Sequence, residues 1–380
     1  MPLEVHWFLP AHGDGREVAK RSGEPDRPGE RREPELDYLA QVALAADRFG
    51  FTGMLTPFGL FCEDPWVIAS ALAQRTRRIK FMIALRPGFV SPVAAAQTAA
   101  TFQRVSDGRL QLNIVTGGDA DEQHRYGDWL DHGQRYERTA EFLDVFLRAW
   151  SGERFDYGGE HYKVAGGLLA RPHPVRPQVF LGGSSAAAQQ AAARYADVFL
   201  AWGEPPQAMA QLVERTRELA AAQGRERPLG FGTRFHVISR DTSAEAWQVA
   251  RRLVDGMDPA RIAQAQQRFR NSESEGQRRM AALHGGRTDM DALEVYPNVW
   301  AGYGLVRPGV GTALVGSHEE VADRIAEYHA LGMDHLILSA QPHLEEAYTV
   351  GECVLPLLRD RGLFAEQPVT KGAVPEGALA

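Results

Sequence analysis

Two side chains capable of chemistry share one apolar stretch, "FGTRFHVISR" at residues 231–240, where Arg234 and His236 lie two positions apart. Aromatic and β-branched neighbours predict a strand, and side chains two apart on a strand lie on the same face. A guanidinium and an imidazole on a buried strand cost free energy unless a partner or ligand compensates for them. The pair therefore predicts a site for a small anion, which arginine binds with fixed, permanently charged donors.

The elements that must position this pair follow a regular alternation of short apolar runs and amphipathic stretches. The predicted strands cover 5–10, 51–57, 79–85, 109–117, 178–183, 197–203, 231–238 and 334–340. The predicted helices cover 35–49, 64–76, 91–105, 133–150, 184–194, 206–223, 242–256 and 343–360. Eight strands each followed by a helix predict parallel pairing and an α/β fold, most simply a closed (β/α)8 TIM barrel. The alternative is an open doubly wound sheet, but "FLPAHGDG" after the first strand is not the expected G-x-G-x-x-G.

Three segments depart from the bare repeat. Residues 11–34 are polar and rich in Gly and Pro, which predicts a mobile loop, and 151–177 predict a small hairpin followed by an extended piece. Nearly a hundred residues separate the last two strands, helical at 260–284 and then Gly-rich with few helix signals at 298–317. We expect residues 1–366 to form a single barrel domain with an insertion or lid at about 258–317, and the tail 367–380 to be disordered.

In such a barrel the active site lies at the carboxyl ends of the strands. The side chains expected there come from most of the strands and from the insertion; they are Cys62, Asn113, Thr116, Trp202, Arg234, His236, Arg307, Gln341 and His343. Arg86 follows the third strand. A buried ion pair is the alternative explanation for Arg234, but almost no acidic residue follows these strands directly, which favours an anionic ligand.

A second anion site is predicted where "FLGGSS" ends the fifth strand. Ser184 or Ser185 caps the next helix, and free backbone N–H groups at a helix start attract phosphate. His132 and Tyr136, four residues apart, share one face of another helix near its start. An ordinary cap and simple packing of Tyr136 are the alternatives, but the two segments together predict that a cofactor phosphate binds apart from the substrate anion.

Composition excludes several classes of function. The net charge is −7 with no concentrated basic stripe, so we expect no nucleic-acid partner. No apolar run is long enough for a membrane span, and the N-terminus lacks a signal-peptide pattern, so we expect a cytoplasmic enzyme. The two cysteines lie far apart, and no Cys/His group has ligand spacing, so neither a disulfide nor a metal site is expected.

The sequence resembles the two-component alkanesulfonate monooxygenases of the bacterial-luciferase-like flavoprotein family, from near the N-terminus to about residue 362. The motifs that carry the resemblance are "WFLPAHGDG", "CEDPW", "ALRPG", "NIVTGGD", "LDHGQRYE", "GGSS", "WGEPP", "RFHVI", "PNVWAGYGLVRPGVGTALVG" and "PHLEEAY". The resemblance implies an oligomeric barrel, a dimer or tetramer, that takes reduced FMN from a separate NAD(P)H-dependent FMN reductase. With O2 it cleaves the C–S bond of an organosulfonate to give an aldehyde and sulfite.

The same resemblance assigns roles to individual residues. It places Cys62, Trp202, Arg234, His236, His343 and, on the mobile loop, Arg307 in the active site. It assigns the FMN phosphate to His132, Tyr136, Ser184 and Ser185. Arg234 and Arg307 would neutralise the sulfonate, and His236 and His343 are the candidates for proton transfer.

One departure leaves the substrate open, because Gln341 stands where the family has Tyr, two residues before the last histidine. A specialised sulfonate such as sulfoquinovose, or a non-sulfonate compound such as a sulfone or a chelator, is the alternative substrate. A deazaflavin-dependent enzyme and a non-catalytic flavin-binding barrel are further alternatives, although the latter would be expected to lack the basic pair.

Overall fold

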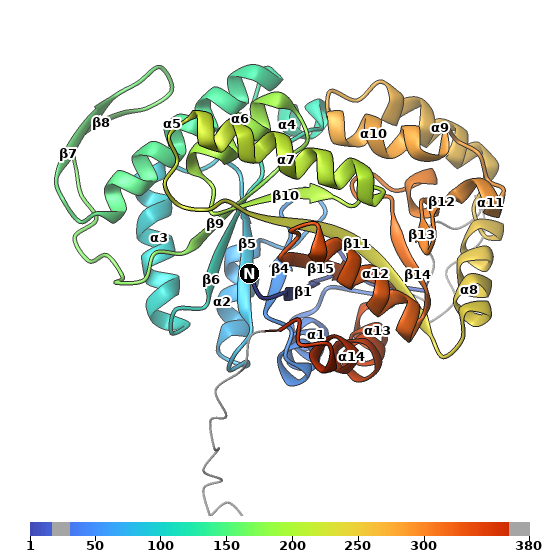
Figure 1. The fold of residues 1–380 in the computed structure, drawn as a ribbon. Helices are drawn as coiled ribbons and strands as arrows, with labels where there is room; N and C mark the ends of the chain where they lie inside the picture. Colours follow the sequence, from blue (N-terminus) through green and yellow to red (C-terminus); the bar gives the residue numbers. More distant parts are fainter. Residues whose placement is uncertain (17–30, 365–380) are drawn as a thin grey trace, which may run out of the picture.

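A closed barrel of eight parallel strands forms the centre of the protein (Figure 1), in a computed structural model that describes residues 1–16 and 31–364. The barrel strands are β1 (Glu4–Phe8), β4 (Gly53–Thr56), β5 (Lys80–Leu85), β6 (Leu110–Ile114), β9 (Gln178–Gly182), β10 (Val198–Trp202), β11 (Gly230–Arg240) and β15 (His335–Ser339). Pairing of β10 with β11 closes the barrel, and β1 pairs with β15. The predicted TIM barrel is therefore confirmed.

Helices surround the barrel, and local sequence signals explain where several of them begin. They are α1 (Leu36–Phe49), α2 (Pro65–Ala73), α3 (Pro92–Val105), α4 (Ala120–Arg125), α5 (His132–Trp150), α6 (Ala186–Tyr195), α7 (Pro206–Ala222), α8 (Ser243–Asp255), α12 (His318–Ala330), α13 (His343–Thr349) and α14 (Leu355–Asp360). The Ser91 side chain accepts a hydrogen bond from the Ala94 amide, and Pro92 takes the first helical position. One turn of π-helix, Val350–Val354, separates α13 from α14 within the predicted helix 343–360.

The barrel interior is arranged in layers along its axis. Seven apolar side chains from six strands form a middle layer: Phe8, Leu55, Met82, Phe180, Val198, Leu200 and Ile337. Below it, at the amino ends of the strands, His6 and His335 lie against the Phe180 ring. Above it, β11 carries Arg234 and His236 at the carboxyl ends. The apolar layer thus separates two polar regions of the barrel.

The insertion continues the sheet instead of forming a structureless loop. The predicted helical stretch 260–284 is two helices, α9 (Pro259–Arg270) and α10 (Glu275–His284), followed by α11 (Met290–Leu293) and β12 (Glu294–Tyr296). The Gly-rich stretch contains β13 (Val299–Trp300), the short 3₁₀ helix η1 (Gly302–Leu305) and β14 (Ala313–Ser317). Strand β11 is long enough to pair with β15 through its first half and with β14 through its second half.

Smaller elements agree with the sequence where the structure describes them. A hairpin of β7 (Phe155–Gly158) and β8 (Lys163–Gly167) forms in the stretch 151–177 and extends from the barrel (Figure 1). In the predicted loop 11–34, β2 (Asp14–Gly15) pairs with β3 (Arg31–Arg32), while residues 17–30 and the tail from 365 lie outside the described residues. No helix in the described part of the chain is long and apolar enough to cross a membrane.

Candidate active site

A cavity of about 290 Å³ opens at the carboxyl ends of the barrel strands. Eight of the predicted site residues line it: Asn113, Thr116, His132, Tyr136, Ser184, Ser185, Trp202 and Arg234. They come from β6, β9, β10, β11 and the starts of α5 and α6, segments far apart in the sequence. The structure therefore brings the predicted cofactor residues and one predicted catalytic residue to a single cavity, as expected for this end of a barrel.

One side of the cavity is rich in hydroxyl groups. The Tyr136 phenol is buried and hydrogen-bonds the side chains of Thr116 and Ser185, while burial raises its pKa. The Ser185 hydroxyl also caps α6 by accepting from the Ala188 amide. A Cβ on Gly183 would lie 2.5 Å from the Ala188 Cβ and 2.9 Å from the Tyr136 hydroxyl, so the backbone here tolerates only glycine without rearrangement. Hydroxyls and a helix start together form a cradle suited to phosphate.

Arg234 lies on the cavity wall with its guanidinium 4.2 Å from the centre of the Phe8 ring. Its Nε is buried without a hydrogen-bond partner, and none of the carboxylates in the described residues lies within ion-pair distance of it. Burial, and secondarily the charge of Arg307, lower its pKa to about 9. The cation therefore rests on an aromatic face in a partly buried position, and an added anion would offset the cost of burying its charge.

Arg307 repeats this pattern on a loop of the insertion. Its Nη1 is buried without a hydrogen-bond partner, and burial lowers its pKa. The loop is closed at its base by Gly304, whose amide donates to the Gly311 carbonyl at 3.0 Å. A Cβ on Gly311 would lie 2.7 Å from the Gly304 Cα, so the two backbones pack in direct contact. The loop thus holds a second guanidinium near Arg234, again without an ion-pair carboxylate among the residues described.

His343 is fixed by a carboxylate that sequence reasoning missed. The Asp14 side chain is fully buried; it accepts from the His343 amide at 2.7 Å and lies 2.9 Å from the His343 Nδ1. Burial would raise the pKa of Asp14, but His343 and the Tyr38 hydroxyl lower it overall. Burial lowers the pKa of His343, with Asp14 opposing and both arginines assisting. With Nδ1 bound, Nε2 is the nitrogen available for proton exchange.

Several contacts fix the side chain of His236, which was predicted to transfer protons. Its Nδ1 lies 2.9 Å from the Ser339 hydroxyl, a further hydrogen bond reaches the Val310 backbone, and its ring stacks on Tyr303 at 4.1 Å. Burial, followed by the charge of Arg307, lowers its pKa well below the ordinary value. A neutral imidazole with these contacts is better suited to joining the barrel to the insertion than to exchanging protons.

The expectation that almost no acidic group reaches the strand ends needs correction. Besides Asp14, Glu122 from α4 forms an ion pair with Arg86, so Arg86 is neutralised and is not an open anion ligand. Folding brings in these carboxylates from loops and a short helix, which the strand-end residues alone did not reveal. Cys62 lies beside this pair rather than on the cavity wall; burial and then Glu122 raise the pKa of its thiol to about 11. A thiolate nucleophile is therefore disfavoured.

The remaining predicted residue, Gln341, is half-buried, precedes a cis Pro342 and leaves its Oε1 without a hydrogen-bond partner. Like Cys62, His236, Arg307 and His343, it is not among the residues that line the cavity. A polar amide oxygen of this kind is available to a ligand donor.

The insertion covers one side of the cavity with residues that the sequence analysis did not identify. Ser274, Glu275 and Gly276, at the start of α10, line the cavity opposite the barrel. A Cβ on Gly276 would lie 3.1 Å from the Trp202 ring, so the helix start packs closely on that side chain. Ion pairs fix this position: Arg279 to Glu204 after β10 at 2.6 Å, and Arg135 of α5 to Glu273 at 3.1 Å.

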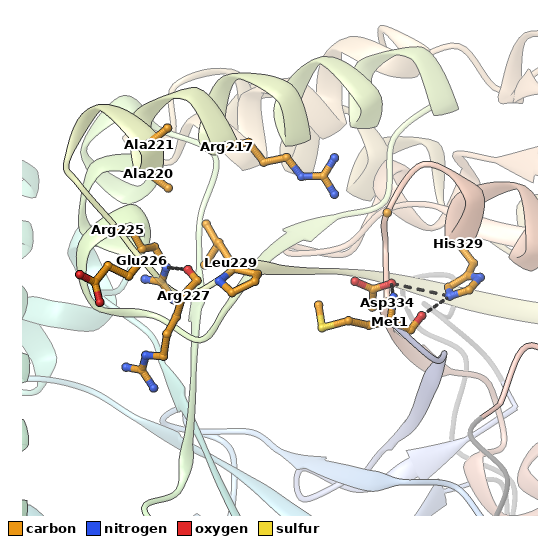
Figure 2. Close-up of a pocket in the computed structure, with 12 residues that line it drawn as sticks. Met1, Arg217, Ala220, Ala221, Arg225, Glu226, Arg227, Leu229, His329 and Asp334 are labelled. Carbon is orange, nitrogen blue, oxygen red and sulfur yellow. Dashed lines mark hydrogen bonds and ion pairs between the residues drawn. The ribbon is translucent and has the colours of Figure 1, made fainter.

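A second cavity, of about 550 Å³, lies at the opposite end of the barrel between α7 and the segment containing Asp334 (Figure 2). The Arg225 side chain donates to the Arg227 and Ala193 carbonyls, and His329 lies between the Met1 carbonyl and the Asp334 carboxylate. None of the predicted site residues lines it. The first cavity, which eight of the predicted site residues line, is therefore the candidate active site.

Buried histidines near the site make stability depend on pH. Burial and then Arg307 lower the pKa of His12 to about 4, whereas an unfolded histidine titrates near 6.5. Below pH 6.5 the unfolded chain binds a proton that the folded chain does not, so stability present above that pH is lost on acidification. Urea denaturation at pH 7.5 and 5.5 should show the wild type losing about 1 kcal/mol more free energy of unfolding than His12→Gln. An identical loss in both proteins would contradict the burial assigned to His12.

Comparison with known proteins places this geometry in a family. The family model for luciferase-like monooxygenases matches residues 3–335. Similar solved structures include riboflavin lyase with modified FMN and riboflavin (21% identity, 96% of this chain and 93% of that one, TM-score 0.77). They also include the EDTA monooxygenase of Chelativorans sp. BNC1 (21% identity, 96% of this chain and 95% of that one, TM-score 0.76). A third is the long-chain alkane monooxygenase LadA (19% identity, 97% of this chain and 93% of that one, TM-score 0.73). These likenesses concern the fold, whereas the family model covers most of the sequence. The chain belongs to the luciferase-like monooxygenase family and is a flavin-dependent monooxygenase of that family.

Proposed function

We propose that this enzyme uses reduced FMN and O2 to cleave the C–S bond of an organosulfonate, giving an aldehyde and sulfite. In this reaction one oxygen atom of O2 enters the aldehyde and the other leaves as water, while reduced FMN is oxidised to FMN. The observation that carries the proposal is the pair of partly buried arginines, Arg234 and Arg307, with no ion-pair carboxylate among the described residues. Two such cations are suited to a ligand with a permanent negative charge on several oxygen atoms.

The cavity residues fit FMN as the cofactor. The phosphate would be held by Thr116, by Tyr136 and by the two serines at the start of α6, Ser184 and Ser185. Asn113 and His132 would lie beside them. Phe8, Leu55 and Ile337 provide an apolar floor for a flat ring system. Reduced FMN supplies the electrons that activate O2 when it is bound. A separate NAD(P)H-dependent FMN reductase would deliver it, as the family resemblance implies.

The catalytic roles follow from the charges around Arg234. Arg234 and Arg307 would bind the sulfonate and stabilise negative charge that develops near it, without reorganisation at the moment of reaction. Asp14 orients His343 through Nδ1, which leaves Nε2 to accept or donate a proton. His236 would position the Arg307 loop through its bonds to Ser339 and Val310. Trp202, Cys62 and Gln341 would shape the substrate side of the site.

The insertion would act as a lid over this site. The start of α10 already lines the cavity, and the Arg279–Glu204 pair attaches it to the barrel. Closure would exclude water and limit the loss of oxidising equivalents as hydrogen peroxide. By family resemblance, we also propose that the enzyme assembles as a dimer or tetramer. We propose that it lies in the cytoplasm.

The deciding experiment measures sulfite released from a panel of substrates with a flavin reductase, NAD(P)H, FMN and O2. The panel contains alkanesulfonates of increasing length and sulfoquinovose, with a sulfone and EDTA as non-sulfonate members. Sulfite from at least one sulfonate is expected. Oxidation of a non-sulfonate with no sulfite from any sulfonate would reject C–S cleavage of sulfonates while leaving the monooxygenase class intact.

Removing the charge of Arg234 should weaken sulfonate binding. Arg234→Gln loses a charge-assisted interaction worth about 1.5–3 kcal/mol, so the dissociation constant of octanesulfonate should rise by about 10- to 100-fold. Fluorescence quenching with reduced FMN present measures this constant. Arg215→Gln, an exposed arginine on α7, is the matched control and should change nothing. Equal affinity in Arg234→Gln and wild type would remove Arg234 from the substrate site.

Arg307→Ala tests the loop separately from the barrel wall. Because the guanidinium has no ion-pair carboxylate among the described residues, its loss should leave the melting temperature nearly unchanged. The ratio of hydrogen peroxide to sulfite should increase, since the site would be less protected and less positively charged. A large fall in melting temperature with an unchanged product ratio would instead indicate a structural role.

A further inference from the structure

We propose that Glu4, His6 and His335, at the amino ends of β1 and β15, form a binding site for Zn²⁺ that is separate from the active site. Three groups able to ligate a metal, two imidazoles and one carboxylate, lie with their ligand atoms within 4.8 Å of one another. Register pairing of Glu4 with His335 holds the two strands in this relation. The sequence did not predict a metal site, because His335 lies 329 residues beyond His6 and only the closure of the barrel brings it to the other two ligands.

Two of the three distances match those in a metal centre. The His6 Nε2 and His335 Nδ1 atoms lie 3.2 Å apart, within hydrogen-bond distance, and the His335 Nδ1 lies 3.7 Å from the Glu4 Oε2. The ligand atoms of Glu4 and His6 are farther apart, within 4.8 Å. Two nitrogen ligands of a tetrahedral zinc ion with bonds of about 2.0 Å are about 3.3 Å apart. Two histidines and a carboxylate are a common zinc ligand set, and a water or a nearby side chain completes four-coordination.

Burial and unpaired atoms show that this cluster is more than a pair of packed rings. His6 is fully buried, and its Nδ1 has no hydrogen-bond partner. The Glu4 Oε2 atom also has no hydrogen-bond partner. A Cβ on Gly53 would lie 2.6 Å from the His6 Nδ1, so the glycine leaves room for this ring inside the barrel. The Gln111 Oε1 is also unpartnered and lies near the His6 Nδ1, not near the ligand nitrogen Nε2. Buried polar atoms without partners are uncommon unless a ligand or ordered water completes them.

The protonation states suit a cation, with one opposing charge. Burial, and secondarily Lys80, lower the pKa of His335 to about 3, and the pKa of His6 is lowered well below its ordinary value. Burial thus favours the neutral form of both imidazoles, which is the form that ligates a metal. Burial raises the pKa of Glu4, which a bound cation would reverse. Lys80 is the nearby cation that opposes metal binding, and Glu4, partly exposed, gives the site a route from solvent.

Such a site would have a structural role. It joins the first barrel strand to the last, and a cross-link between distant parts of a chain removes much of the freedom of the unfolded state. The middle apolar layer, which includes Phe180 and Ile337, separates the site from the flavin cavity. The metal would therefore stabilise the barrel without touching substrate.

The test uses the full chain without a polyhistidine tag, stripped of metal with a chelator and dialysed. Titration with Co²⁺ should give the visible absorption bands of four-coordinate cobalt at one ion per chain, and Zn²⁺ should displace it and raise the melting temperature. His335→Ser and Glu4→Gln should weaken Zn²⁺ binding at least about tenfold. Lys80→Gln should strengthen it by up to about tenfold, because it removes the opposing charge.

His329→Gln is the matched control. It removes a second histidine at the same end of the barrel that lies 3.6 Å from Asp334, outside the proposed ligand set (Figure 2). Metal affinity should be unchanged in this variant. The proposal is overturned by an absence of stoichiometric Co²⁺ binding, by affinity retained in both ligand variants, or by affinity lost in His329→Gln. Since Lys80→Gln is predicted to gain affinity, a folding defect in a ligand variant cannot produce the whole expected pattern.

Discussion

The arrangement of the candidate active site depends on one constraint, a positive charge that the barrel partly buries with no carboxylate among the described residues to balance it. Arg234 points from β11 into the cavity and rests on the Phe8 ring, with burial lowering its pKa. The neighbouring acidic groups are occupied elsewhere: Asp14 binds His343, and Glu122 binds Arg86. Among the described residues, these charges are thus sorted into satisfied pairs and two guanidiniums without an ion-pair carboxylate, an arrangement that favours an anionic ligand.

Layering of the barrel interior makes this possible. The apolar layer around Phe180 and Leu200 keeps the polar groups at the two ends of the barrel apart, so each end has its own electrostatics. At one end, hydroxyl groups and the Arg234 guanidinium line an open cavity. At the other, two neutral imidazoles and a carboxylate lie in a small buried cluster. A single fold thereby carries a catalytic region and a separate polar core.

Much of the fold could be predicted because periodicity and turn signals are local. Every barrel strand was expected within a few residues, and Ser91 with Pro92 marked the start of α3. The hydroxyl cradle was also predictable, since Gly-Gly-Ser-Ser at a strand end is a local signal. Asp14 and the Glu4–His335 contact were not, because each depends on a partner more than 300 residues away that only barrel closure supplies. The continuation of the sheet by β14 was hidden by glycines that weaken any strand signal.

The base of the Arg307 loop, where Gly304 and Gly311 are in contact, restricts how the site can open. Gly304 and Gly311 are bonded backbone to backbone, and β14 follows directly in the sheet with β11. Both stems of the loop are consequently fastened to the rigid part of the molecule. Arg307 cannot travel far by bending of the main chain while the glycine contact persists, so swinging of its own long side chain is the cheapest way to admit or release a ligand. Movement of the Arg307 guanidinium would then depend on rotamer exchange, which is far faster than domain motion.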